Sequence, residues 1–119
     1  MENQGGRASN LNPFGFNYGF STDLGRVRNQ NEDCGHADKW LLVVADGMGG
    51  HQAGEVASEI TVSTLRNTCA PAPLGADDSN LVHPHLADLV KATVDANSAI
   101  IRTSLEDPSK QGMGTTVTA

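Results

Sequence analysis

The apolar run of residues 40–45, followed directly by Asp46-Gly47-Met48-Gly49-Gly50-His51, limits most strongly how this chain can fold. Six consecutive apolar residues, aliphatic or β-branched after the first, are typical of a buried strand. The glycines that follow lack a Cβ, so another group can approach the backbone closely there. The sequence therefore predicts a buried strand that ends on one carboxylate, Asp46, beside accessible backbone.

The residues before this run predict two further strands. Aromatic side chains alternate with Gly and Asn over residues 14–20, which indicates a strand with one aromatic face. Such a face is either a platform for stacking bases or the inner side of a sheet. The sheet is favoured because the chain carries 8 basic and 14 acidic residues, a net charge of −6. Residues 31–36 form the second predicted strand. A turn at Asp23-Leu24-Gly25 and short connections favour an antiparallel meander.

The residues after the run predict helices. Apolar residues recur every three or four positions over residues 51–67, and again from the first turn at Pro84 to Leu105. A loop rich in Pro, Gly and Asp, residues 70–80, lies between them. The second helix should stop at Asp107, because a residue before proline avoids helical angles. A β-branched strand begins at residues 115–119, and we expect it to lack a pairing partner. Strands with helices give an α+β fold class.

Composition excludes several classes of protein. At 119 residues the chain suits one domain, and its negative charge opposes both nucleic acid and anionic membranes as partners. No apolar run approaches membrane-spanning length, and the first residues do not resemble a signal peptide. Cys34 and Cys69 form no metal-binding or redox motif, which favours a reduced, cytoplasmic protein. Residues 1–12 are expected to be a loose tail, and residues 13–119 the domain.

Asp46-Gly47 has two interpretations. An Asp-Gly pair often forms a tight hairpin turn. Here, however, three glycines in four positions lead directly into a predicted helix. In the functional interpretation, Asp46 bridges two divalent cations and the Gly47 carbonyl binds one of them, since Mg²⁺ and Mn²⁺ prefer oxygen ligands. The sequence excludes an EF-hand, a phosphate-binding P-loop and a dinucleotide fingerprint, because their further residues are absent.

Three charged residues upstream are candidates for the same site. A lone arginine such as Arg28 is usually a surface residue, but its guanidinium can bind two phosphate oxygens at once. Glu32 and Asp33 are either solvated charge or part of a metal site. Adjacent strand residues point to opposite faces, so only one of them can face a metal directly, and the other would hold water or orient a ligand. His36 and His51 are interpreted as structural, with a general acid as the alternative, and His83 and His85 as surface residues.

Three motifs together resemble the metal-dependent protein phosphatase 2C family. They are Val27-Arg28 with Asn31-Glu32-Asp33, Asp46-Gly47-Met48-Gly49-Gly50-His51, and Gly112-Met113-Gly114-Thr115-Thr116. The Met-Gly-Gly-His form is similar to the bacterial branch. The resemblance implies a four-layer α-β-β-α sandwich with two antiparallel sheets, of which residues 13–119 would be an N-terminal part. The family's later acidic motifs are not found, so the catalytic domain would be incomplete at its C-terminal end and inactive alone.

The resemblance also implies a reaction and residue roles. The family hydrolyses phosphoserine and phosphothreonine in proteins with a water that bridges two Mn²⁺ or Mg²⁺ ions. By motif match, Arg28 would bind the substrate phosphate, Asp46 and Gly47 would bind metal, and Glu32 and Asp33 would hold metal-bound waters. Met48 stands where eukaryotic members carry a histidine proposed as general acid.

The expected partners are phosphorylated proteins, including a serine/threonine kinase, in bacterial signalling. The alternatives are a non-catalytic phosphate- or metal-binding module and an α+β interaction domain whose glycines only form a turn.

Overall fold

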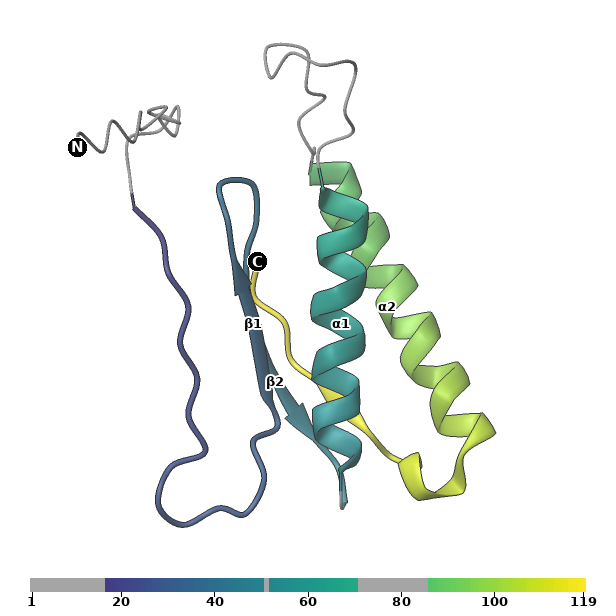
Figure 1. Ribbon diagram of the computed structural model, residues 1–119. Coiled ribbons are helices and arrows are strands. Elements are labelled where there is room, and N and C mark those ends of the chain that lie inside the picture. Colours follow the sequence, from purple (N-terminus) through teal and green to yellow (C-terminus); the bar gives the residue numbers. More distant parts are fainter. Residues whose placement is uncertain (1–16, 51, 71–85) are drawn as a thin grey trace, which may run out of the picture.

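The described part of the chain forms an antiparallel sheet of three strands with two α-helices, shown in Figure 1. This computed structural model describes residues 17–50, 52–70 and 86–119. Its elements are, in chain order, β1 (Asp33–Ala37), β2 (Leu42–Met48), α1 (Ala53–Cys69), α2 (Leu86–Glu106), the short 3₁₀ helix η2 (Pro108–Lys110) and β3 (Gly114–Thr115). The strand order is β1-β2-β3, with β2 antiparallel to both neighbours. The predicted α+β class and antiparallel sheet are confirmed.

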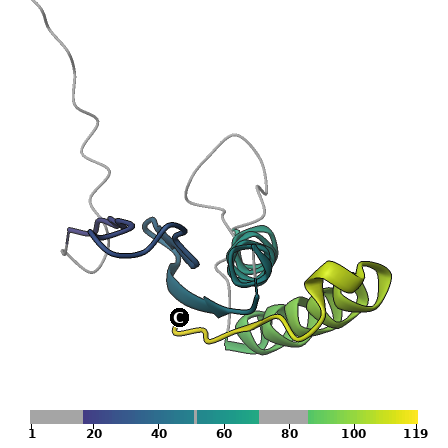
Figure 2. The ribbon, with the colours of Figure 1, turned by 90° about the horizontal axis from the view of Figure 1, so that it is seen from below.

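The two faces of β2 differ sharply in exposure. Leu41, Val43 and Ala45 are buried, whereas the alternate residues Leu42 and Val44 remain about half exposed, at 48% and 53%. The buried face packs on α1, and α2 packs mainly on α1 rather than on the sheet, so both helices lie on one side (Figure 2). We call the other side, which carries the exposed β2 residues, the open face.

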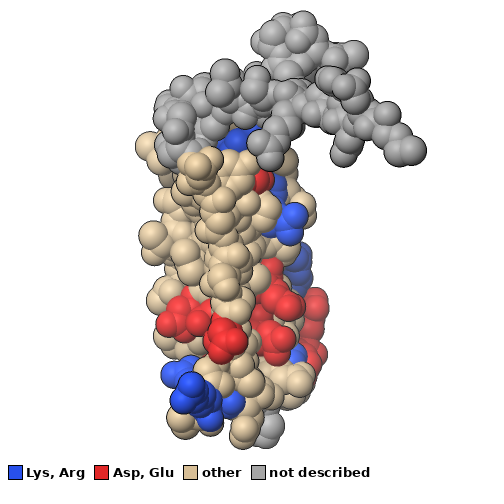
Figure 3. Space-filling view, turned by 60° about the vertical axis from the view of Figure 1, so that its left-hand side comes forward, with Lys and Arg blue, Asp and Glu red and all other residues tan. Residues whose placement is uncertain are grey.

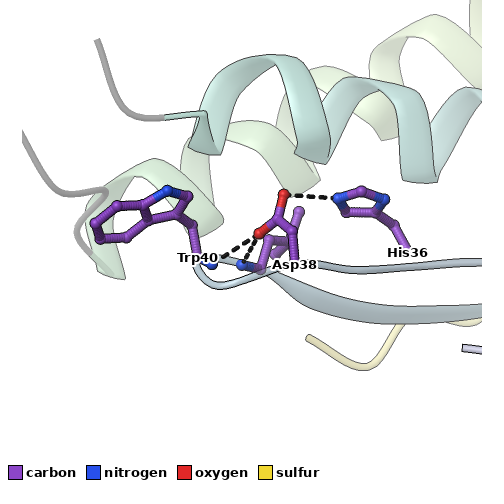
Figure 4. Close-up of polar contacts among 4 residues, drawn as sticks. His36, Asp38 and Trp40 are labelled. Carbon is purple, nitrogen blue, oxygen red and sulfur yellow. Dashed lines mark hydrogen bonds and ion pairs between the residues drawn. The ribbon is translucent and has the colours of Figure 1, made fainter. Parts of the chain in front are cut away.

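The turn between β1 and β2 is held by Asp38. Its Oδ1 accepts hydrogen bonds from the backbone N–H groups of Trp40 and Leu41 at 2.7 and 2.8 Å, and its Oδ2 lies 2.7 Å from His36 Nε2 (Figure 4). Partial burial opposes ionisation, but these hydrogen bonds outweigh it and lower the pKa of the Asp38 carboxyl. Lys39 Nζ lies 4.9 Å from the centroid of the Trp40 ring. Asp38 is therefore a structural partner of His36 in this turn.

The described part of the aromatic segment, residues 17–20, does not form the predicted strand. Residues 17–20 have no regular secondary structure, and residues 14–16 lie outside the described residues. The Phe20 ring instead lies on Gly35 of β1, where an added Cβ would come within 2.1 Å of ring carbon Cε2. Gly35 pairs with Val44, so this contact is on the open face. Residues 17–20 therefore contact β1 through the aromatic ring of Phe20, and they do not pair with it as a strand.

The third strand comes from the C-terminal part of the chain. Gly47 pairs with Thr115 and Met48 with Gly114, and a further bridge joins Val44 to Thr118. The expectation that this strand lacks a partner is therefore wrong. The cause is a contact distant in sequence, because β2 offers its second edge to residues about 70 positions later.

The helices match the sequence pattern closely. α1 begins and ends two residues later than predicted, and α2 ends at Glu106, one residue before Asp107. The Asp107 carboxylate accepts a hydrogen bond from the Ser109 N–H at 2.9 Å and starts η2. The predicted turn at Asp23 is confirmed, because its Oδ1 accepts a bond from Gly25, whose φ is +77°. His51, residues 1–12 and residues 71–80 of the predicted loop lie outside the described residues. No helix in the described ranges is long and apolar enough to cross a membrane.

Candidate metal and phosphate site

Two carboxylates lie opposite each other where β2 leaves the sheet. Asp33, the first residue of β1, is the register partner of Asp46 in β2, and both are exposed. Residues directly opposite in an antiparallel pair share a face, with Cβ atoms about 4.5–5.5 Å apart. Asp33 and Asp46 are therefore neighbours on the open face. Two carboxylates so placed repel each other, and a cation between them would offset this electrostatic repulsion.

Gly47 occupies a place that no side chain could fill. It is buried, and its N–H donates to the Glu32 carbonyl at 3.0 Å. An added Cβ would lie 2.1 Å from the carbonyl oxygen of Gly54 in α1 and 2.7 Å from the carbonyl oxygen of Glu32. Asp46-Gly47 is part of β2, so the hairpin-turn interpretation is wrong. Close contact with α1 and the chain before β1 explains the glycine.

Glu32 and Asp33 point in different directions, as their adjacency predicts. The Glu32 carboxylate lies over Gly54 in the first turn of α1, since a Cβ on Gly54 would come within 2.5 Å of Glu32 Oε1. Asp33 shares the open face with Asp46 instead. The backbone N–H of Asp33 donates to Asn31 Oδ1 at 3.1 Å, and this hydrogen bond holds the backbone that carries both acids. One carboxylate thus faces Asp46, and the other faces the start of α1.

Arg28 lies beside this region in the exposed segment before β1. Arg28, Glu32 and Gly49 line an open hollow of about 500 Å³, together with Val27, Asn29 and Gln30. With the described residues, Arg28 forms no ion pair, so its guanidinium can receive an anion. Figure 3 shows a band of acidic atoms across the lower half of one face, with basic atoms directly below it. A cation and several carboxylates at one end of the sheet suit a phosphate ester held near metal ions.

The described residues do not by themselves form a complete cluster of acidic, histidine or cysteine metal ligands. Among them, no group of three or more His, Cys, Asp or Glu side chains could hold a metal ion together. The structure brings Asp33 and Asp46 to one face and places Glu32 and Arg28 on the neighbouring hollow.

Sequence reasoning gave no role to two residues that shape this region. Thr116 accepts a hydrogen bond at its Oγ1 from the Asp46 N–H at 3.2 Å, and its own N–H donates to the Asp46 carbonyl at 2.9 Å. Gly54 allows α1 to approach Gly47 and Glu32. A glycine in the first turn of a predicted helix is the signal that points to such close packing. No local signal pairs Thr116 with Asp46.

Comparisons with known proteins give consistent results. No protein-family model matches the chain. It is 42% identical over 102 residues to the serine/threonine protein phosphatase PstP of Mycobacterium tuberculosis, covering 86% of this chain and 18% of that protein. It is 37% identical over 107 residues to the serine/threonine phosphatase stp of Listeria monocytogenes, covering 84% of this chain and 40% of that protein. The chain therefore spans less than half the length of either relative.

Solved structures agree with these sequence relatives. The catalytic domain of PstP in complex with two manganese ions matches with a TM-score of 0.67 and 43% identity, over 80% of this chain and 38% of that one. The PPM Ser-Thr phosphatase MsPP from Mycobacterium smegmatis, in complex with cacodylate, matches with a TM-score of 0.60 and 31% identity. That match covers 82% of this chain and 35% of the other.

Proposed function

Because this chain belongs to the metal-dependent protein phosphatase 2C (PPM) family, we propose that it contributes to hydrolysis of phosphoserine and phosphothreonine in proteins. In this proposal it forms the N-terminal part of a catalytic domain that is a four-layer α-β-β-α sandwich. The observation that carries the proposal is the opposed pair Asp33 and Asp46, beside a hollow that contains Arg28.

The residues present fit manganese or magnesium. Carboxylate and carbonyl oxygens are the ligands that these cations prefer. The close contact of Gly47 with Gly54, where a Cβ would come within 2.1 Å of the Gly54 carbonyl oxygen, holds the Asp46-Gly47 backbone in one place. When two such cations are bound, they activate water and neutralise charge on the attacking and leaving oxygens. Asp46 would bridge them, and the Gly47 carbonyl would bind one.

The remaining residues would bind and orient. Arg28 would hold two oxygens of the substrate phosphate, since its planar guanidinium matches their spacing. Asp33, on the same face as Asp46, and Glu32, beside α1, would accept hydrogen bonds from metal-bound water and fix its position. Met48 is 59% exposed on the face that carries Asp46, and its thioether has no proton to give a leaving group. Protonation must come from another group.

The proposed substrates are phosphorylated proteins, including a serine/threonine kinase, and the proposed location is the cytoplasm. Reduced cysteines support that location: Cys34 and Cys69 are free thiols, and burial raises the pKa of both. Neither thiol is therefore activated as a nucleophile, which agrees with hydrolysis by water instead of a covalent phosphoenzyme.

The test is metal-dependent turnover by the full-length protein. We expect release of phosphate from a phosphothreonine peptide with added Mn²⁺, loss of release in EDTA, and recovery when Mn²⁺ is restored. Undiminished turnover in EDTA would contradict the metal mechanism. Binding of Mn²⁺ or phosphopeptide without any turnover would favour the alternative, a non-catalytic binding module.

A further inference from the structure

Three segments of the chain meet at Gly54. Glu32 precedes β1, Met48 ends β2, and Gly54 is the second residue of α1. A Cβ built on Gly54 would lie 2.5 Å from Glu32 Oε1, 2.8 Å from Glu32 Cδ and 2.9 Å from the backbone nitrogen of Met48. All three distances are below ordinary van der Waals contact. The Glu32 carboxylate and the end of β2 therefore occupy the space that any other side chain at position 54 would need.

Space, and not backbone conformation, explains this glycine. Among the described glycines, positive φ angles occur at Gly25, Gly49 and Gly112, and Gly54 is not one of them. Glycine is a weak helix former, so alanine would favour the first turn of α1 if room existed. The chain carries the weaker helix former where α1 touches Glu32 and the Gly47 backbone.

We propose that Gly54 is a positioning residue for the metal site, acting through Glu32 and through the distance between α1 and the end of β2. This inference rests on the proposed function. Gly54 leaves room for the Glu32 carboxylate beside the start of α1, where it would hold metal-bound water. It also lets its own carbonyl pack on Gly47, whose carbonyl would bind metal.

The side chain added in Gly54→Ala would displace two groups. The Glu32 carboxylate ends a flexible side chain and can move away, which removes it from its position. Met48 N is backbone and resists displacement, so α1 and β2 would have to separate. Both changes disturb groups that would orient metal ligands. Changes of this kind typically weaken metal binding roughly 10- to 100-fold.

The experiment compares Gly54→Ala with wild type in the full-length protein. Calorimetric titration with Mn²⁺ should give a dissociation constant roughly 10-fold or more above wild type. The KM for a phosphothreonine peptide at saturating Mn²⁺ should change less than about 2-fold, because Arg28 is untouched. The matched control is Gly50→Ala, since nothing lies within 4 Å of a Cβ at Gly50. This control should bind Mn²⁺ like wild type.

A double-mutant cycle shows whether Gly54 acts through Glu32. In a Glu32→Ala background the carboxylate is gone, so adding Gly54→Ala should weaken Mn²⁺ binding further by much less than it does in wild type. If Gly54→Ala alone does not fold, the double variant decides: recovery of folding and Mn²⁺ binding in the Glu32→Ala background supports the role through Glu32, and failure to fold there as well overturns it. Equal further loss in both backgrounds would overturn the role through Glu32.

The remaining outcomes separate this inference from the proposed function. If wild type binds Mn²⁺ and Gly54→Ala binds it equally well, the inference fails and the proposed function stands. The same holds if Gly54→Ala only lowers the melting temperature in EDTA, because that is a purely structural effect. If wild type neither binds Mn²⁺ nor hydrolyses the peptide, both fail.

Discussion

Asp33 and Asp46 should destabilise the metal-free protein, because their side chains lie directly opposite on one face of the sheet. Two unit charges at roughly 5 Å repel by about 0.8 kcal/mol in water, and both residues are exposed, so the aqueous value applies. Like charges opposed across strands cost about 0.2–1 kcal/mol, in agreement with this figure. Either Asp33→Asn or Asp46→Asn should therefore raise the free energy of unfolding by up to about 0.8 kcal/mol.

The assay is urea unfolding of the full-length protein in EDTA at low ionic strength. Both single variants should be more stable than wild type, and the double variant should gain little beyond either one. The gain should shrink in 1 M salt, where the screening length is about 3 Å. With Mn²⁺ the order of stability should reverse, and wild type should be more stable than either variant, because the metal stabilises only the protein that binds it.

A neutral comparison is provided by Glu59→Gln, an exposed acid on α1. This variant should match wild type in EDTA and gain the same stabilisation from Mn²⁺. The reasoning is refuted if both aspartate variants are less stable than wild type in EDTA, or if their gain is unchanged by salt.

Three further predictions follow from other parts of the chain. Arg28→Ala should raise the KM for a phosphopeptide more than it lowers kcat, because a guanidinium that binds ground-state phosphate contributes uniform binding; an unchanged KM would contradict this. The lowered pKa of Asp38 adds stability that is present above its unfolded value, about 4, and lost as the pH falls through its lower folded value. Unfolding curves from pH 6 to 2 should therefore show a steeper loss for wild type than for Asp38→Asn, and parallel curves would refute it. A polypeptide of residues 1–119 should bind the dye ANS and turn over no phosphopeptide, since α2 exposes the apolar residues Leu86, Val90, Val94, Ile101 and Leu105; dye exclusion with robust turnover would contradict this.

The sequence predicts the elements whose signals are local. The apolar run at residues 40–45 becomes the central strand, and the periodic segments become α1 and α2. The second helix ends at Glu106 because Asp107 precedes proline, and a residue before proline avoids helical angles. Each of these outcomes depends on residues close together in the chain, where periodicity and proline chemistry act directly.

Contacts between distant residues are what the sequence could not predict. The pairing of β3 with β2 joins residues about 70 positions apart, so the strand near Thr115 looked unpaired. The aromatic alternation at residues 14–20 resembled a strand, but Phe20 covers Gly35 instead of joining the sheet. Tertiary packing overrides local propensity in both cases.

The candidate site shows the same division. The sequence predicts Arg28, Glu32 and Asp46 as candidates, because their chemistry suits phosphate and hard cations. Their arrangement could not. The alternation rule left open whether Glu32 or Asp33 faces Asp46, and only the register of β1 with β2 assigns Asp33. The structural need for Gly54 likewise appears only when α1 is placed against β2.

The most direct test of the proposed metal chemistry is the kcat of Asp46→Asn at saturating Mn²⁺, measured on a phosphothreonine peptide with the full-length protein. Loss of a bridging carboxylate removes several kcal/mol of transition-state stabilisation. At about 1.4 kcal/mol for each tenfold change in rate, kcat should fall by roughly 10³-fold or more. Glu59→Gln should keep the wild-type value. A near-normal kcat for Asp46→Asn at saturating Mn²⁺ would contradict the assignment of Asp46 as the bridging ligand.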